Sequence, residues 1–280
     1  MDSLSPARAM TGRIALEIVA DTAAGVRAAL ANGADRIELC SALAIGGVTP
    51  SPGLMRMAAE AAKSSGIKSS GIRPSGIPIR AMIRPRGGDF TYSPDELEVM
   101  RHDIEAARAE GMAGVVFGAN TQTGELDAEA LRMLCRYARV QGLEIALHRS
   151  FDLTPDPLAA LDLAVELGIA TVLTSGGRRT AREGVDVLKQ LMERAQGRIE
   201  ILAGIGITPD TVDDIVRLGD VRSVHASCTE SVDNVTGNNN QAWLLGHLRA
   251  GQKDTAGATI AAMREALNSI ESTLRKEGRQ

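Results

Sequence analysis

The sequence is poor in cysteine and in aromatic residues. Its 280 residues include three cysteines, one tryptophan, two tyrosines and three phenylalanines. Cys40, Cys135 and Cys228 are odd in number and contain no CxxC pair, so the pattern indicates neither a disulfide framework nor a zinc knuckle. We expect reduced thiols, and a core built from Ala, Val, Ile, Leu and Met.

The chain also lacks a dominant charge and long apolar runs. Acidic residues number 35 and basic residues 31, and no block of like charge resembles the basic stripe of a nucleic-acid binder or a polybasic membrane patch. Residues 1–13 have no apolar signal-peptide region, and no run of about eighteen apolar residues could span a bilayer. We therefore expect a cytoplasmic protein that binds a small molecule or an ion, with no nucleic-acid or membrane partner.

Short β-branched runs alternate with helical segments along the chain. Eight runs predict strands: Ile14–Val19, Arg36–Cys40, Ile79–Arg84, Gly114–Gly118, Leu143–His148, Thr171–Thr174, Ile199–Ala203 and Arg222–His225. Helical spacing is clearest at 95–110, 128–139, 157–167, 184–195 and 255–275. This alternation predicts a single-domain α/β protein, a TIM-type (β/α)8 barrel. A doubly wound open sheet is the competing architecture, although no GxGxxG motif follows the first strand.

The predicted barrel extends over residues 14–275. Flexible tails are expected at 1–13 and 276–280. Residues 64–78 contain Ser-Gly-Ile three times and predict a low-complexity insertion loop on the amino-terminal face, away from the end where barrels bind ligands. A second loop, 231–242, follows the last strand and is expected to border the ligand site.

Side-chain alternation along the strands predicts a polar barrel interior. If the apolar residues of the run 36–40 face the helices, then Glu38 and Cys40 face inward. The same parity predicts further inward side chains: Glu17, Met82, Arg84, Ala146, His148, Val172, Thr174 and His225. Because an unpaired buried charge costs several kcal/mol, the charged members must pair with one another or with a ligand.

Four residues are candidate catalytic groups. His148 closes the fifth strand and can act as an acid or a base near neutral pH, and Asp152 is near enough in sequence to orient it or a cation. Glu38 and Glu17 complete the set. The alternative is a structural network in which the two glutamates only neutralise Arg84.

Basic and glycine-rich loops are candidate anion sites. Arg84-Pro-Arg-Gly-Gly-Asp places two guanidinium groups, which suit carboxylate or phosphate, beside a glycine pair. Glycine loops also follow strands six and seven, where Thr208 and Pro209 are typical of an N-cap and the first helical residue. The candidate ligand-binding residues are Arg84, Arg86, Asp89, Ser175, Gly176, Gly204, Gly206, His225 and Ser227. Ordinary turns are the alternative for each loop.

Six strings together resemble the CutC family. They are NGADRIELC (32–40), GGVTPSPG (46–53), MIRPRGGDFTYS (82–93), HRSFD (148–152), VLTSGG (172–177) and GIGIT (204–208). The resemblance runs from about Leu16 to Ser227. It implies a cytoplasmic β/α barrel, a homo-oligomer (a dimer or higher) and a part in copper homeostasis.

Copper(I) is the metal that the resemblance implies. Cys40 matches a family position near the site, and His148 or His225 could add a nitrogen ligand. Some members have a second cysteine where this chain has Val19. Cuprous ion favours soft sulfur ligands, whereas buried carboxylates and arginines suit an anionic metabolite better. Two functions therefore stay open: copper(I) handling, and metal-independent lyase, isomerase or hydrolase chemistry on a small phosphorylated or carboxylated metabolite.

Overall fold

Parallel strands form a closed barrel at the centre of the molecule. The computed structural model describes residues 13–65, 76–231 and 253–278. Each strand from β1 to β8 pairs with the next, and β8 pairs with β1. Their bounds are β1 Ala15–Ala20, β2 Arg36–Leu39, β3 Ile79–Met82, β4 Gly114–Phe117, β5 Glu144–Leu147, β6 Thr171–Thr174, β7 Glu200–Gly204 and β8 Ser223–Ala226. The predicted TIM-type barrel is confirmed.

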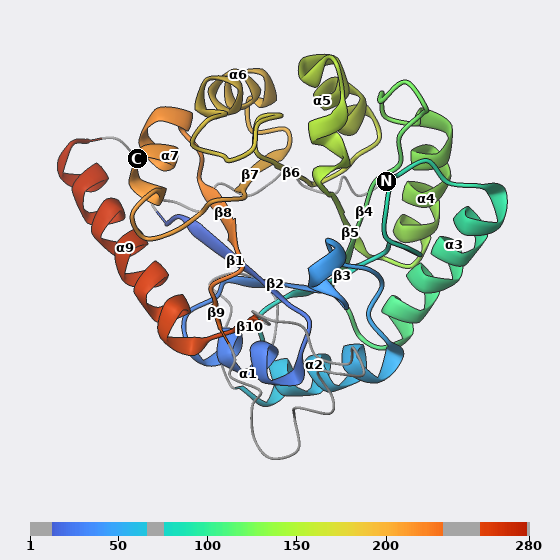
Figure 1. The fold of residues 1–280 in the computed structure, drawn as a ribbon, viewed down its shortest axis with the longest axis horizontal. Coiled ribbons are helices and arrows are strands. Elements are labelled where there is room, and N and C mark those ends of the chain that lie inside the picture. The colour runs from blue at the N-terminus through green and yellow to red at the C-terminus, as the bar shows by residue number, and fades with distance from the viewer. Residues whose placement is uncertain (1–12, 66–75, 232–252, 279–280) are drawn as a thin grey trace, which may run out of the picture.

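Helices surround the barrel (Figure 1). They are α1 Ala23–Ala31, α2 Pro52–Ser64, α3 Pro94–Ala109, α4 Ala128–Val140, α5 Pro157–Glu166, α6 Val185–Ala195, α7 Val212–Gly219 and α9 Gly257–Lys276. Local signals explain several starts: α3, for example, has a capping box of Ser93 and Glu96. Helix α9 contacts both α1 and α7, so it closes the ring of helices.

Along the strands, the outward side chains form an apolar core against the helices, and the inward side chains form a polar barrel interior. Ile18, Ile37 and Leu147 belong to the core between strands and helices, whereas Glu17 and Glu38 alternate with such residues and are buried inside the barrel. Alternation therefore places the charged groups that form the site.

The predicted parity is wrong for β6. Val172 packs in the helix-facing core, and Leu173 lines the barrel pocket. Thr174 donates its hydroxyl hydrogen to Asp152. The sequence Thr-Val-Leu-Thr is equally apolar on both faces, so nothing in the strand itself marks which face is inward.

Helix α7 begins later than predicted. Its N-cap is Thr211, not Thr208, and Val212 is the first helical residue. The Thr208 carbonyl accepts hydrogen bonds from the amides of Thr211 and Val212, so Pro209 belongs to a turn before the helix.

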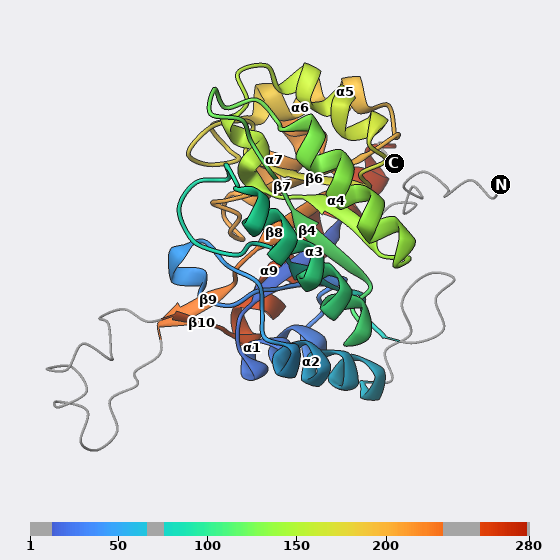
Figure 2. The ribbon, with the colours of Figure 1, turned by 90° about the vertical axis from the view of Figure 1, so that its right-hand side faces the viewer.

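Four short elements of the described chain lie at the carboxyl ends of the strands. They are the 3-10 helices η1 (Leu43–Ile45) and η2 (Arg149–Leu153) and the antiparallel pair β9 (Thr229–Ser231) and β10 (Lys253–Thr255). Figure 2 shows β9 and β10 at the same end of the barrel as η1.

Several segments for which the sequence makes predictions lie wholly or partly outside the residues that the structure describes. Most of the tail 1–13, of the insertion 64–78 and of the loop 231–242, and the last two residues of the tail 276–280, lie outside the described residues. None of the described helices is long and apolar enough to cross a membrane. The cytoplasmic location and the homo-oligomer stay predictions.

Candidate functional site

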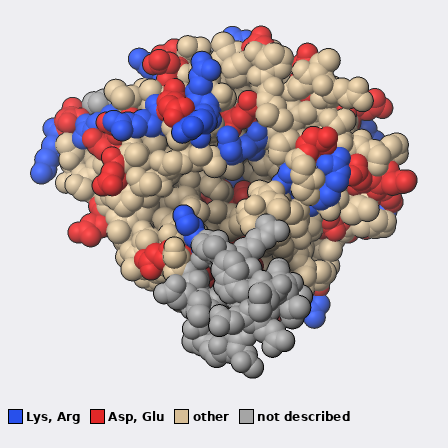
Figure 3. Space-filling view, in the orientation of Figure 1, with Lys and Arg blue, Asp and Glu red and all other residues tan. Residues whose placement is uncertain are grey.

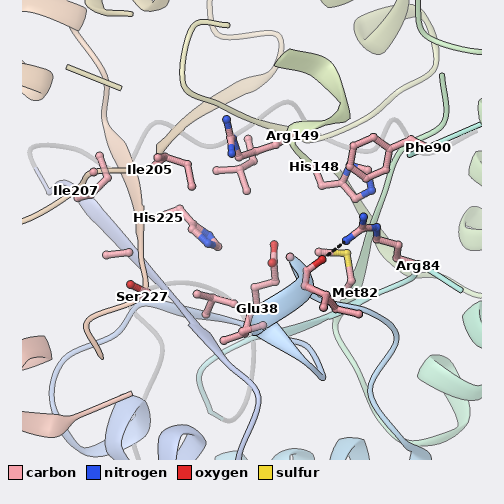
Figure 4. Close-up of a pocket in the computed structure, with 17 residues that line it drawn as sticks. Glu38, Met82, Arg84, Phe90, His148, Arg149, Ile205, Ile207, His225 and Ser227 are labelled. Carbon is pink, nitrogen blue, oxygen red and sulfur yellow. Dashed lines mark hydrogen bonds between the residues drawn. The ribbon is translucent and has the colours of Figure 1, made fainter. Parts of the chain in front are cut away.

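A pocket of about 380 Å³ lies at the carboxyl ends of the barrel strands. This size suits a small ligand. The face shown in Figure 3 is hollowed near its centre, with Lys and Arg side chains along the rim above the hollow. The polar side chains in the pocket wall are Glu38, Arg84, His148, Arg149, His225 and Ser227 (Figure 4). Apolar residues, among them Leu43, Ile45, Met82, Leu173 and Ile205, form the rest of the wall.

Arg84 is a buried cation whose hydrogen-bond acceptors are neutral carbonyl groups. Its guanidinium donates hydrogen bonds to the carbonyls of Ile45, Gly47 and Gly88 at 3.2, 3.0 and 2.6 Å and lies 4.8 Å from the centre of the Phe90 ring. Its Nε is buried without a hydrogen-bond partner. Among the described residues, no carboxylate forms an ion pair with it. Its charge is therefore available to an anionic ligand.

His148 offers a second buried donor in the same wall. Its Nδ1 accepts a hydrogen bond of 3.1 Å from the Ser150 amide, which places the proton of the neutral ring on Nε2. This Nε2 is also buried without a partner. Burial, together with the positive charge of Arg84, lowers the pKa of His148 to about 3. The ring is therefore neutral at pH 7 and acts as a hydrogen-bond donor.

Glu38 brings a carboxyl group to the same pocket. It is 3% exposed, and none of the described Lys or Arg side chains forms an ion pair with it. The Cys40 thiol donates a weak hydrogen bond to its Oε1 at 3.5 Å. Burial raises the pKa of Glu38, although the nearby His225 opposes the effect. Glu38 can therefore carry a proton closer to neutral pH than an exposed glutamate.

Glu17 lies in an ion network below the pocket and does not line it. Its carboxylate binds Arg36, Arg80 at 3.4 Å and Nδ1 of His225 at 2.8 Å. Burial alone would raise the pKa of Glu17, but Arg36 and the hydrogen bond from His225 outweigh burial and lower it. Arg36 and Arg80 also pair with two further acids, Glu144 and Glu200, which are partly exposed at the first residues of β5 and β7. We call these five residues, Glu17, Arg36, Arg80, Glu144 and Glu200, the interior ion network.

The sequence prediction missed four members of that network. Arg36, Arg80, Glu144 and Glu200 stand at the first or second residue of their strands. They share the inward parity that identified Glu38, so the same alternation was the available signal. The alternative interpretation is a structural network in which the two glutamates neutralise Arg84. Glu17 instead pairs with Arg36 and Arg80.

Asp152 binds the loop after β6, and no hydrogen bond or ion pair joins its side chain to His148. Its Oδ1 accepts from the Thr174 hydroxyl at 2.5 Å and from the amides of Ser175 and Gly177 at 3.1 and 3.0 Å. Its Oδ2 accepts from Nε of Arg149 at 2.8 Å and from the Ser175 hydroxyl at 3.1 Å. Asp152 therefore orders the pocket rim through Arg149 and this loop.

The remaining predicted ligand residues divide between the pocket and its surroundings. Gly206, His225 and Ser227 line the pocket. Arg86, in the loop after β3, instead binds Asp89 of the same loop and Glu96 of α3. Three others lie outside the pocket lining: Ser175, Gly176 and Gly204. A Cβ atom at Gly204 would lie 2.6 Å from Leu173, so this glycine allows close packing inside the barrel.

The donor set is a poor fit for copper(I). Cys40 is buried and outside the pocket lining, and it shares a small cluster with the thioether of Met82. Burial, with the charge of Glu38, raises the pKa of the Cys40 thiol well above 9.0, whereas copper binds thiolate. Within the described chain, the residues grouped closely enough to hold a metal are Glu17, Glu38 and His225. They contain no sulfur, and the arginines bound to Glu17 would repel a cation.

Comparisons with known proteins agree on one family. The CutC family model matches residues 14–230. A CutC family protein of Rhizobium meliloti (strain 1021) is 46% identical over 257 residues, covering 92% of this chain and 97% of the relative. One from Caulobacter vibrioides (strain NA1000 / CB15N) is 43% identical over 258 residues, with coverage of 92% and 98%. The crystal structure of a CutC protein from Streptococcus agalactiae, named for copper homeostasis, has a TM-score of 0.70 and 32% identity, and covers 76% of this chain and 98% of its own.

Proposed function

The chain belongs to the CutC family, and we propose that its barrel pocket binds a small organic anion and acts on it by metal-independent acid–base chemistry. The observation that carries the proposal is Arg84, a buried cation held by carbonyl groups in the pocket wall. Burying a cation without an anionic partner is costly, and a bound anion would supply that partner.

The other polar groups suit the same ligand. His148 would donate its Nε2 hydrogen to an oxygen of the anion or of an adjacent carbonyl. Figure 4 shows Glu38 and His225 lying away from Arg84 and His148 on the pocket wall. Glu38 would give or take a proton at the part of the ligand that lies beyond the anionic group. Proton transfer of this kind is shared by lyases and isomerases, and by hydrolases that activate water.

Titration calorimetry of the purified protein with a panel of small carboxylates and phosphate esters tests the proposal. We expect Arg84→Gln to weaken binding about tenfold or more, which corresponds to at least about 1.4 kcal/mol. Arg56→Gln is the matched control, because Arg56 is an exposed arginine paired with Glu110. Equal weakening in both variants, or no binding of any anion by the unmodified chain, contradicts the proposal.

Copper(I) binding is the second candidate. The name of the Streptococcus agalactiae relative favours it, as does the shared cluster of Cys40 and Met82. The raised pKa of the Cys40 thiol and its position behind the residues that line the pocket favour the anion instead.

A further inference from the structure

The loop after β6 forms a cradle that binds one carboxylate of the chain itself. Its donors are the amides of Ser175 and Gly177, the hydroxyls of Thr174 and Ser175, and the guanidinium of Arg149. All of them bind Asp152, whose side chain is 6% exposed. We call this set the β6 cradle.

The β6 cradle has the construction of an anion site. Gly176 and Gly177 both have positive φ, at 70° and 67°, and the amides of Ser175 and Gly177 reach the same carboxylate oxygen, while the Gly176 amide between them binds the Thr174 hydroxyl oxygen. A Cβ atom at Gly176 would lie 2.5 Å from the Gly184 carbonyl oxygen, so the turn requires glycine. Backbone amides, hydroxyls and an arginine fork are the donors that bind phosphate in other barrels.

We propose that Asp152 occupies, from within the chain, the position that the β6 cradle would otherwise offer to a phosphate group, so that the pocket selects carboxylates over phosphate esters. This inference rests on the proposed function and names its ligand class. A phosphate entering here would have to displace Asp152, and while Asp152 stays in place its negative charge repels the phosphate.

Charge in the pocket wall favours the same ligand class. Asp152 pairs with Arg149, and Glu17 pairs with His225. Arg84 then remains as the cation in the wall without a carboxylate among the described residues. A carboxylate brings one negative charge, whereas a phosphate monoester brings about 1.5 to 2 at neutral pH. The single positive charge of Arg84, with the N–H of His148 beside it, balances the single negative charge of a carboxylate.

Calorimetry on the unmodified full chain compares glycerate with glycerol 3-phosphate, which differ in the anionic group. We expect glycerate to bind at least about tenfold more tightly, with the binding lost in Arg84→Gln. Binding of glycerol 3-phosphate as tightly as glycerate, with the same dependence on Arg84, would overturn the inference and leave the proposed function in place.

Removing the carboxylate of Asp152 tests the cradle itself. We expect Asp152→Ala to lower the melting temperature, and millimolar inorganic phosphate or acetate to restore part of the loss by entering the vacated position. Asp152→Asn is the matched control, because its amide fills the space and leaves no room for an added ion. Asp89→Ala controls for loss of an exposed acid in another loop of this face.

The outcomes separate the two proposals. A folded Asp152→Ala protein that gains no affinity for phosphate or acetate overturns the inference, and Asp152→Ser provides the same test if the alanine variant does not fold. If the unmodified chain binds no anion but Asp152→Ala binds inorganic phosphate, the cradle is supported and the proposed function is overturned.

Discussion

Nδ1 of His225 lies 2.8 Å from Oε1 of Glu17, and this contact connects the pocket to the interior ion network. His225 lines the pocket, whereas Glu17 is held from below by Arg36 and Arg80. A change in the protonation of His225 therefore reaches both the ligand site and the stability of the barrel.

The His225–Glu17 contact predicts a stability that decreases at alkaline pH. Burial alone would lower the pKa of His225, but the hydrogen bond to Glu17 and the charge of Glu38 raise it above 6.5. A raised pKa contributes stability that is fully present below the unfolded value and is lost as pH rises through the folded value. We expect the unfolding free energy of the unmodified chain to fall toward that of His225→Asn as the pH rises from about 6.5 into the alkaline range. Urea denaturation across this range measures it, and a difference that does not change with pH contradicts the prediction.

Replacement by glutamine should lower the free energy of unfolding much more at Glu17 than at Glu38. Glu17→Gln leaves Arg36 and Arg80 short of a buried carboxylate, and breaking a buried ion pair costs roughly 3–5 kcal/mol. Glu38 has no such pair among the described residues, so Glu38→Gln should change the unfolding free energy by less than about 1 kcal/mol while removing acid–base chemistry. Urea denaturation of both variants checks this. Similar losses of stability would place Glu38 in the structural network as well.

The imidazole ring of His148 should stay neutral from about pH 8 down to about pH 5. Burial and the charge of Arg84 hold its pKa at about 3. This lowered value destabilises the fold as pH decreases below the ordinary 6.5, because the unfolded chain then binds the proton more readily. In two-dimensional NMR, we expect the ring nitrogens of His148 to keep one protonated and one unprotonated shift from about pH 8 down to about pH 5. A titration in that interval would show that the ring is an acid–base group and not a fixed donor.

The sequence predicts the barrel well because period-2 strands and helical segments alternate along its length. Alternation also predicts correctly that Glu38, Arg84 and His148 lie in one pocket. The role predicted for Asp152 rested on its nearness in sequence to His148, and that signal cannot set the direction of a side chain in a 3-10 turn, which here follows hydrogen bonds to the loop after β6.

The interior ion network illustrates a second limit of sequence reasoning. A charged residue at the start of a strand, such as Arg36 or Glu200, is equally typical of a solvated strand end. Only closure of the barrel brings these ends together, so their pairing depends on strand register across several neighbours.

Copper(I) binding can be decided by one titration. The Cys40 thiol must lose its proton to bind the metal, and burial with the charge of Glu38 raises its pKa well above 9.0. We therefore expect competition titration of the reduced protein with cuprous ion to give weak binding that Cys40→Ser leaves nearly unchanged. Cys228→Ser is the matched control, because Cys228 is a partly buried thiol beyond β8. Tight stoichiometric binding that disappears in Cys40→Ser and persists in Cys228→Ser would show instead that the cluster of Cys40 and Met82 opens to hold copper, and the anion proposal would then lose its advantage over copper(I).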